Sequence, residues 1–368
     1  MIIGVPKEIK TDEYRVALLP VGAHLLTEDS HTVLIERGAG SGSGLDDQMY
    51  SSAGAQIVQT ADEIYSQAEM LVKVKEPQPQ ELPKLRAGQI VFCFFHFAAS
   101  RELTARCLQA GISAVAYETL SDAHGRLPLL TPMSEIAGRM SIQEGTKYLE
   151  RPMMGQGILL GGVPGVAPAN VLILGGGVVG TNAARMAAGF GANVTIMDIN
   201  LDRLRYLDEI LPANVRTIYS DPHAVQDYTL RSDLVIGAVL IPGSRASLLI
   251  DRPLVSKMKT GSVIVDVCID QGGCVETSRP TTHSNPTYVV EGVVHYCVTN
   301  IPGAVSKNSS QALCNATLPF VRELASLGVE AFADVDAGHA AAINIHKHRL
   351  VNKALSRVFP DLPKRGRK

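Results

Sequence analysis

A glycine-rich stretch near the middle of the chain restricts the possible folds more than any other feature. The residues VLILGGGVVGTNAARMAAGFGANVTIMDIN run from Val171 to Asn200, and Gly175, Gly177 and Gly180 have the spacing GxGxxG between a strand-like and a helical run. In a strand–turn–helix unit, the first glycine permits a tight turn and the second lets a pyrophosphate approach the backbone. The third allows the helix and strand to pack closely. The stretch therefore predicts a dinucleotide-binding unit whose helix N-terminus faces the phosphates.

An acidic residue supports this interpretation and indicates which dinucleotide is bound. Asp198 stands at the end of the second predicted strand of the unit. A carboxylate there can bind both ribose hydroxyls of NAD and repel the 2′-phosphate of NADP. The alternative is a glycine-rich turn followed by a solvated acid, but strand, loop, helix and acid occur in the expected order. We therefore expect NAD as the cofactor.

Short apolar runs alternate with helical stretches along most of the chain. From the glycine loop onward, the predicted strands are Val171–Leu174, Val194–Met197, Val215–Tyr219, Leu234–Val239, Ser262–Val267 and Val293–Val298. Before the loop, they are IIGVP, TVLIERG, AQIVQ, MLVKVKEP, IVFCFFH and AVAYETL. This alternation is typical of parallel, doubly wound sheets. The sequence therefore predicts an α/β fold with two doubly wound domains, the second a Rossmann-type NAD-binding domain.

The first predicted domain is discontinuous in the sequence, and the second is inserted into it. We assign residues 1–130 and 303–368 to a catalytic, substrate-binding domain and residues 131–302 to the NAD-binding domain. The C-terminal stretches SSQALCNATLPFVRELASLG and AAINIHKHRLVNKALSRVF are predicted as amphipathic helices that return to the first domain. On such a helix His346 and His348 would face different ways, so we expect no metal-binding pair there.

Composition excludes several classes of function. The formal net charge of −2 over 368 residues disfavours nucleic acid or an acidic membrane surface as the main partner. Lys7 and Glu8 interrupt the N-terminus, so no signal peptide is expected, and no apolar run of about 18 residues predicts a membrane span. The six cysteines include no CxxC pair. We expect buried free thiols in a cytoplasmic protein rather than disulfides or a zinc site.

Polar residues follow several of the predicted strands, and open parallel sheets bind ligands beyond the carboxyl ends of their strands. They are Arg15, Lys75, His96 and Glu118 in the first domain, and Asp270 and Asn300 in the second. For any one of them, a local salt bridge at the end of a loop is an equally good interpretation. Together they suit a cleft that binds a 2-oxo acid: guanidinium binds a carboxylate, ammonium polarises a carbonyl and imidazole moves a proton.

The same segments resemble alanine dehydrogenases, within the alanine dehydrogenase and transhydrogenase α-subunit family. The resemblance is carried by MIIGVPKEIKTDEYRVALLP, KVKEPQP, TPMSEIAGRMSIQEG and LGGGVVGTNAA, and most specifically by the block from Val263 to Val305. It extends to about Leu350. The resemblance implies NAD-dependent, reversible oxidative deamination of L-alanine to pyruvate and ammonium, usually in a homohexamer.

The resemblance also implies roles for individual residues. Arg15 and Lys75 would bind the substrate, His96 would donate and accept protons, and Asp270 would be a second catalytic group. The implied cofactor contacts are Ser134, Gly175, Gly177, Val178, Val179, Gly180, Asp198, Arg203, Ser220, Val239, Leu240, Val267, Cys268, Ile269, Asp270, Arg279, Val298, Thr299, Asn300 and Ile301.

Some positions depart from the family pattern. The strand before His96 is rich in phenylalanine, and Ile301 stands where the family usually has methionine, so the substrate preference within the family is open. Some members bind a metal near the position of Glu118, helped by a glutamate and a histidine on a C-terminal helix. Glu323 fits that pattern, but Leu327 replaces the histidine, so we expect no metal.

Three alternatives remain beside alanine dehydrogenase. A related 2-oxo acid or amino acid dehydrogenase would share the site but prefer another substrate. A transhydrogenase-like subunit shares the GVPKE-type opening and the glycine loop, but it has no need for His96. A non-catalytic NAD-binding protein would bind the nucleotide tightly without turnover.

Overall fold

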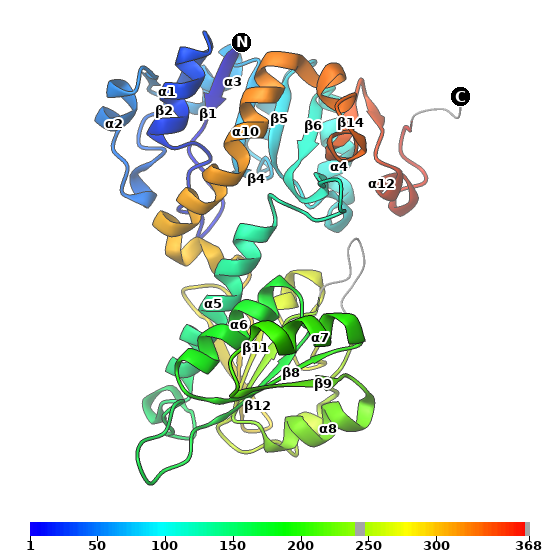
Figure 1. The fold of residues 1–368 in the computed structure, drawn as a ribbon. Helices are drawn as coiled ribbons and strands as arrows, with labels where there is room; N and C mark the ends of the chain where they lie inside the picture. The colour runs from blue at the N-terminus through cyan, green and yellow to red at the C-terminus, as the bar shows by residue number, and fades with distance from the viewer. Residues whose placement is uncertain (240–246, 365–368) are drawn as a thin grey trace. The chain divides into compact units, whose positions relative to one another are not determined.

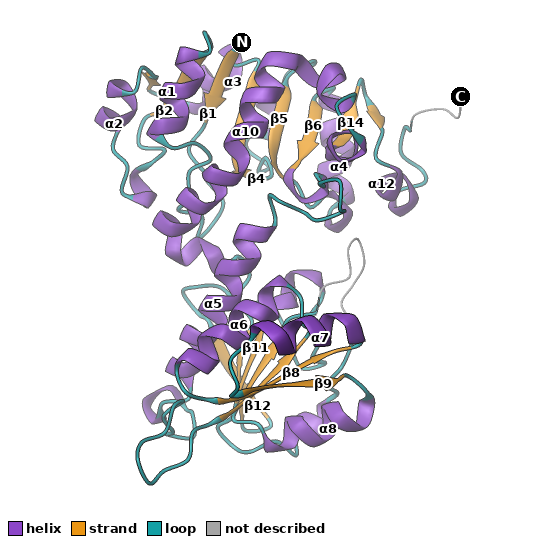
Figure 2. Cartoon of the chain, viewed as in Figure 1, coloured by secondary structure: helices purple, strands orange, loops and turns teal. Residues whose placement is uncertain are grey.

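The computed structural model describes residues 1–239 and 247–364, and contacts between Cα atoms divide the chain into two compact units. Unit 1 comprises Met1–Met133 and Gly303–Lys368, and unit 2 comprises Ser134–Pro302. Each unit is built on its own sheet, and helices flank both sheets (Figures 1 and 2). Of the helices described, none is both long and apolar enough to cross a membrane.

Unit 1 is organised around a sheet that, within the described residues, has eight strands in the order β15-β14-β6-β5-β4-β1-β2-β3. The strands from β6 to β3 are parallel to one another, whereas β14 is antiparallel to both of its neighbours, β6 and β15. Their bounds are β1 Ile2–Val5, β2 Thr32–Glu36, β3 Gln56–Val58, β4 Met70–Lys75, β5 Ile90–Phe94, β6 Ser113–Ala116, β14 Ile343–His346 and β15 Arg349–Leu350. Strands β4, β5 and β6 are buried along their whole length, as expected for strands covered on both faces.

The helices of unit 1 follow local sequence signals. They are α1 Pro20–Glu28, α2 Asp47–Ser52, α3 Ala61–Gln67, α4 Arg101–Ala110, α10 Ser306–Ala333, α11 Ala337–Ala342 and α12 Lys353–Val358. In α4 the Ser100 side chain accepts a hydrogen bond from the Leu103 N–H, and Gly111 ends the helix with a φ of 71°. A glycine in the left-handed conformation is a common way for a helix to end.

Unit 2 contains a mostly parallel sheet with seven strands among the described residues, in the order β12-β13-β11-β10-β7-β8-β9. The bounds are β7 Asn170–Leu174, β8 Asn193–Asp198, β9 Val215–Tyr219, β10 Leu234–Gly237, β11 Val263–Asp266, β12 Thr287–Val290 and β13 Val293–Tyr296. Its helices are α5 Thr131–Tyr148, which continues from unit 1, α6 Val178–Gly189, α7 Leu201–Ile210, α8 Pro222–Arg231 and α9 Arg252–Val255. The predicted strands are all present; the antiparallel edge strand β12 was not predicted.

The C-terminal segment is only partly the pair of helices that the sequence predicts. Helix α10 forms, but the second predicted helix is interrupted by the antiparallel hairpin β14–β15 between α11 and α12. Ile343 and Ile345 are buried where β14 pairs with β6, the last parallel strand on this side of the sheet. Lys347 and His348, with φ of 49° and 58°, form the two-residue connection, and positive φ at both central residues is what a tight hairpin turn requires. Pairing of the exposed edge of β6 thus outweighs helix propensity here.

Candidate active site

The glycine loop joins β7 to α6 as the sequence predicts. Gly175 has a φ of 105°, which L side chains rarely adopt. A Cβ atom at Gly180 would lie 1.9 Å from the Gly175 carbonyl oxygen, so only glycine fits where the helix approaches the strand. A Cβ atom at Gly177 would meet nothing within 4 Å. The space beside Gly177, at the start of α6, therefore fits the predicted role of this residue in phosphate binding.

Asp198 lies beside this loop. Its Oδ2 atom accepts a hydrogen bond of 2.7 Å from the Gly176 N–H, and its Oδ1 atom accepts one of 2.8 Å from the Asn200 N–H. Arg203 supports the loop from α7, because its Nε atom donates to the Gly176 carbonyl oxygen at 2.6 Å and its Nη2 atom donates to the Thr181 hydroxyl at 2.8 Å. The half-buried carboxylate is thus fixed beside the glycine loop by two backbone N–H groups.

Most of the other cofactor contacts implied by the resemblance follow parallel strands of unit 2. Ser220 follows β9, Val239 follows β10, and the stretch Val267–Asp270 lies in the 3₁₀ turn Val267–Gln271 after β11. Val298, Thr299, Asn300 and Ile301 follow β13, and the φ of Asn300 is 61°. Because these strands run parallel to one another and to β7, their carboxyl ends lie at the same edge of the sheet. The fold thus brings these residues to the edge that bears the glycine loop.

Two further predicted contacts, Ser134 and Arg279, have different surroundings. Ser134 is half-buried in α5. Arg279 is exposed, and its guanidinium group lies 4.3 Å from the centre of the Tyr288 ring. Leu240 lies outside the described residues.

Unit 1 brings Arg15, Lys75 and His96 to the carboxyl edge of its sheet. Arg15 follows β1, Lys75 ends β4 and His96 follows β5. These three strands are neighbours in the sheet, with β4 between the other two. The two basic side chains are largely buried, whereas His96 is exposed.

Arg15 has a partner that the sequence alone did not indicate. Its Nε and Nη2 atoms donate to the two carboxylate oxygens of Glu13, at 2.6 and 2.5 Å, and its Nη1 atom donates to the Met133 sulfur at 2.9 Å. Burial alone would raise the pKa of Glu13, but hydrogen bonding to Arg15 and its charge outweigh burial and lower it. Glu13 is therefore an anion that fixes the direction of the guanidinium group.

Lys75 is positioned by a second group of charges that the sequence did not reveal. The Glu8 Oε1 atom accepts hydrogen bonds from the Val74 N–H at 2.6 Å and the Lys75 N–H at 3.3 Å. Lys73 lies fully buried between Glu8 and Glu81, at 3.2 and 2.9 Å. Burial would lower the pKa of Lys73, but the two carboxylates and Tyr65 raise it, so this lysine remains charged. The end of strand β4 is thus held by paired charges as well as by apolar contacts.

His96 has an exposed side chain on a constrained backbone. Its φ is 50°, and its ring stacks on Phe94 with ring centres 5.8 Å apart. Glu118, after β6, accepts hydrogen bonds from the His96 N–H at 2.6 Å and the Phe95 N–H at 3.2 Å. Glu118 thus holds the backbone of His96 in its left-handed conformation.

The second residue of the family's metal pattern is also engaged. Glu323, on α10, lies 3.2 Å from the His339 Nε2 atom, and the Nδ1 atom of that histidine lies 2.8 Å from Asp336. His339 comes from α11 and was not singled out by the sequence.

A hollow of about 460 Å³ lies at the other edge of the unit 1 sheet. Ile90 and Ser113, which begin β5 and β6, line it together with Glu330, His346 and Lys347. Parallel sheets bind ligands at the carboxyl ends of their strands. This hollow is therefore separate from the edge that carries Arg15, Lys75 and His96.

Comparison with known proteins identifies the family. The model described as alanine dehydrogenase/PNT, N-terminal domain, matches residues 4–137, and that of the C-terminal domain matches residues 141–353. The alanine dehydrogenase of Halomonas elongata is 51% identical over 359 residues, which cover 98% of this chain and 97% of that protein. The chain belongs to the alanine dehydrogenase/PNT family. The predicted family membership is confirmed.

Further relatives support the same assignment. The alanine dehydrogenase of Bacillus subtilis is 52% identical over 95% of this chain and 92% of its own length. A solved structure named L-alanine dehydrogenase is 53% identical and superposes with a TM-score of 0.94, covering 98% of this chain and 99% of that one. The predicted two-domain α/β fold of this family member is therefore confirmed.

The transhydrogenase of Sinorhizobium meliloti, a member of the alternative class, shares the fold. Its structure superposes with a TM-score of 0.82 over 95% of this chain and 100% of its own, at 24% identity. At this level of identity the likeness concerns the fold alone.

Proposed function

We propose that this chain catalyses the NAD-dependent, reversible oxidative deamination of L-alanine to pyruvate and ammonium. The observation that carries the proposal is the identity of about half the residues to alanine dehydrogenases over nearly the full length. The arrangement of Arg15, Lys75 and His96 at one sheet edge supports it, because these groups suit a 2-oxo acid. The proposed enzyme is an amino-acid oxidoreductase.

The residues of unit 2 fit a nicotinamide dinucleotide. The open space at Gly177 leaves room for a pyrophosphate at the start of α6, and the Asp198 carboxylate suits the two hydroxyls of a ribose. Bound NAD would supply the hydride acceptor for alanine oxidation, and NADH the donor for the reverse reaction. We propose NAD rather than NADP because a 2′-phosphate beside Asp198 would bring two negative charges together.

The residues of unit 1 would bind and orient the substrate. Arg15 would hold its carboxylate, with Glu13 fixing the direction of the guanidinium group. The Lys75 ammonium group would stabilise negative charge on the carbonyl oxygen. His96 would take up and return protons at its imidazole nitrogens as ammonia adds and water leaves. We assign Asp270, from unit 2, as a second catalytic group that stabilises the positive charge on nitrogen.

The test is NADH absorbance in a reaction with pyruvate and ammonium. We expect oxidation of NADH only when both substrates are present, and reduction of NAD with L-alanine. Replacing pyruvate by other 2-oxo acids defines the preference within the family. Turnover that requires no ammonium would exclude amino-acid dehydrogenase activity.

The same assay separates the alternatives. A transhydrogenase-like subunit would transfer hydride between two nucleotides without pyruvate, and a non-catalytic NAD-binding protein would bind NADH without oxidising it. We also propose that the enzyme works in the cytoplasm as a homohexamer without a bound metal near Glu118. The cytoplasmic location rests on the free thiols and the homohexamer on the family resemblance. The absence of a metal rests on Leu327, which replaces the expected histidine.

A further inference from the structure

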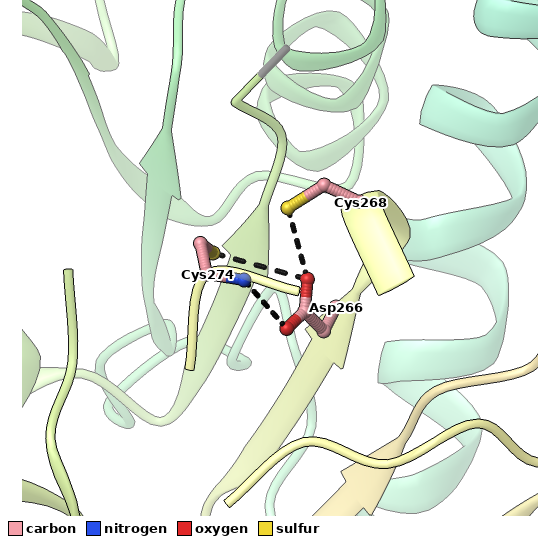
Figure 3. A group of neighbouring side chains, drawn as sticks. All are labelled: Asp266, Cys268 and Cys274. Carbon is pink, nitrogen blue, oxygen red and sulfur yellow. Dashed lines mark hydrogen bonds between the residues drawn. The ribbon is translucent and has the colours of Figure 1, made fainter. Parts of the chain in front are cut away.

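A buried carboxylate in unit 2 has two thiols as neighbours. Asp266, the last residue of β11, is fully buried, as is Cys274, and Cys268 is 7% exposed. The Asp266 Oδ1 atom lies 3.0 Å from the Cys268 sulfur and 3.8 Å from the Cys274 sulfur, and Oδ2 accepts a hydrogen bond of 3.0 Å from the Cys274 N–H (Figure 3). Three side chains within nine residues of sequence thus converge on one point.

In the part of the chain that the structure describes, no cationic side chain pairs with this carboxylate. Among residues 1–239 and 247–364, the hydrogen-bond partners of Asp266 are these two thiols and one N–H group, and it takes part in no ion pair. Thiols are weak donors, and burying a carboxylate without a cation is costly. A cation at the cluster would compensate this charge.

The geometry suits a small metal ion. The three donor atoms lie within 4.8 Å of one another. A tetrahedral zinc ion binds sulfur at about 2.3 Å and carboxylate oxygen at about 2.0–2.2 Å, so its ligand atoms stand roughly 3.4–3.8 Å apart. The two sulfur–oxygen distances, 3.0 and 3.8 Å, require only small side-chain shifts to reach this range.

Two glycines leave room for the cluster. A Cβ atom at Gly237, the last residue of β10, would lie 2.6 Å from the Cys274 sulfur. A Cβ atom at Gly273, whose φ is 74°, would lie 2.6 Å from the Asp266 Oδ2 atom. A side chain at either position would press on the donor atoms.

We propose that Asp266, Cys268 and Cys274 bind one thiophilic divalent cation of the zinc class. Oδ1 and the two sulfurs are the ligands, and the Cys274 N–H orients the carboxylate through Oδ2. As each metal–sulfur bond forms, the thiol proton passes to solvent, and a water completes four-coordination. Sulfur ligands select against magnesium. The ion ties the end of β11 to the loop before Val275, across the turn that contains Asp270.

Titration of the reduced, metal-free, full-length protein with Cd²⁺ tests the site. We expect the ultraviolet cadmium–thiolate band to saturate at one ion per chain, to disappear when Zn²⁺ competes, and to be unaffected by Mg²⁺. Cys268→Ala, Cys274→Ala and Asp266→Asn should each weaken binding by roughly tenfold or more. Cys107→Ala, at an equally buried thiol of unit 1, is the matched control and should bind as the wild type does.

Circular dichroism and X-ray absorption complete the test. Circular dichroism shows whether each variant is folded, and Cys268→Ala removes the least buried ligand if Cys274→Ala does not fold. X-ray absorption of the zinc-loaded wild type should show two sulfur neighbours at about 2.3 Å. A site with nitrogen and oxygen neighbours alone, absence of the cadmium band, or equal binding by Cys268→Ala would each overturn the proposal. None of these readings depends on turnover, so they stand apart from the proposed enzymatic function.

Discussion

At the scale of single residues, His96 combines an exposed ring with a backbone that Glu118 holds in place. If the imidazole is the proton carrier, its removal affects the reaction and not nucleotide binding, because the glycine loop and Asp198 belong to unit 2. We expect His96→Ala to lower kcat by about 10²–10⁴, while the Kd for NADH, measured by fluorescence titration, stays within error of the wild type. His24→Ala, at an exposed histidine of α1, is the control. Near-normal turnover of His96→Ala would show that another group moves the proton.

Asp198 is the residue that we expect to determine the preference for NADH over NADPH. Its carboxylate is bound to the Gly176 N–H and would repel a 2′-phosphate. We expect Asp198→Ala to raise the ratio of kcat/KM with NADPH to kcat/KM with NADH, and to weaken NADH binding. Asp202→Ala, at an exposed carboxylate of α7 that pairs with Arg205, should leave the ratio unchanged. A wild-type enzyme that used both cofactors equally well would contradict the role of Asp198.

At the scale of elements, α10 contains a glycine that no other residue can replace without strain. Gly328 has φ 71° and ψ 174°, a conformation that is nearly restricted to glycine, although a Cβ atom there would meet nothing within 4 Å. We expect Gly328→Ala to lower the free energy of unfolding by about 1–3 kcal/mol through backbone strain alone.

A matched variant separates strain from crowding. Gly189, at the end of α6, is exposed and also has open space around a Cβ atom, but its φ is not positive. Gly189→Ala should therefore leave stability unchanged or raise it by up to about 1 kcal/mol. Denaturant unfolding of the two variants would refute the argument if both changed stability in the same direction.

Some of these elements and site residues could be predicted from the sequence, and others could not. The parallel strands were predictable because short, buried, β-branched runs differ clearly from helical periodicity. The hairpin β14–β15 was missed because Ile343 and Ile345 pair with β6, more than two hundred residues away in sequence. Arg15, Lys75 and His96 were predictable from their places at strand ends. Glu13, Glu8 and His339 could not be predicted as partners of site residues, because the loops that bring them into contact have no clear sequence signal.

At the scale of the whole molecule, the proposed homohexamer would account for an exposed apolar segment of unit 2. Between Met154 and Val166, four apolar side chains are 53–63% exposed: Met154, Leu159, Val163 and Val166. A cluster of exposed apolar side chains in one segment is typical of a surface that a partner covers. In a homohexamer, that partner would be a second copy of the chain.

Sedimentation at a series of concentrations tests whether this segment lies in an interface between copies of the chain. The wild type should sediment as about six times the 39.3 kDa chain, because the proposed hexamer buries the segment. The double variant Val163→Asp, Val166→Asp should form smaller species, because charged side chains are unfavourable in the centre of an interface. Its circular dichroism should match that of the wild type, since both side chains are exposed and contribute little to the core of unit 2. A wild type that remains at the mass of one chain at all concentrations would exclude the hexamer, and an unchanged assembly in the double variant would place the interface elsewhere on the chain.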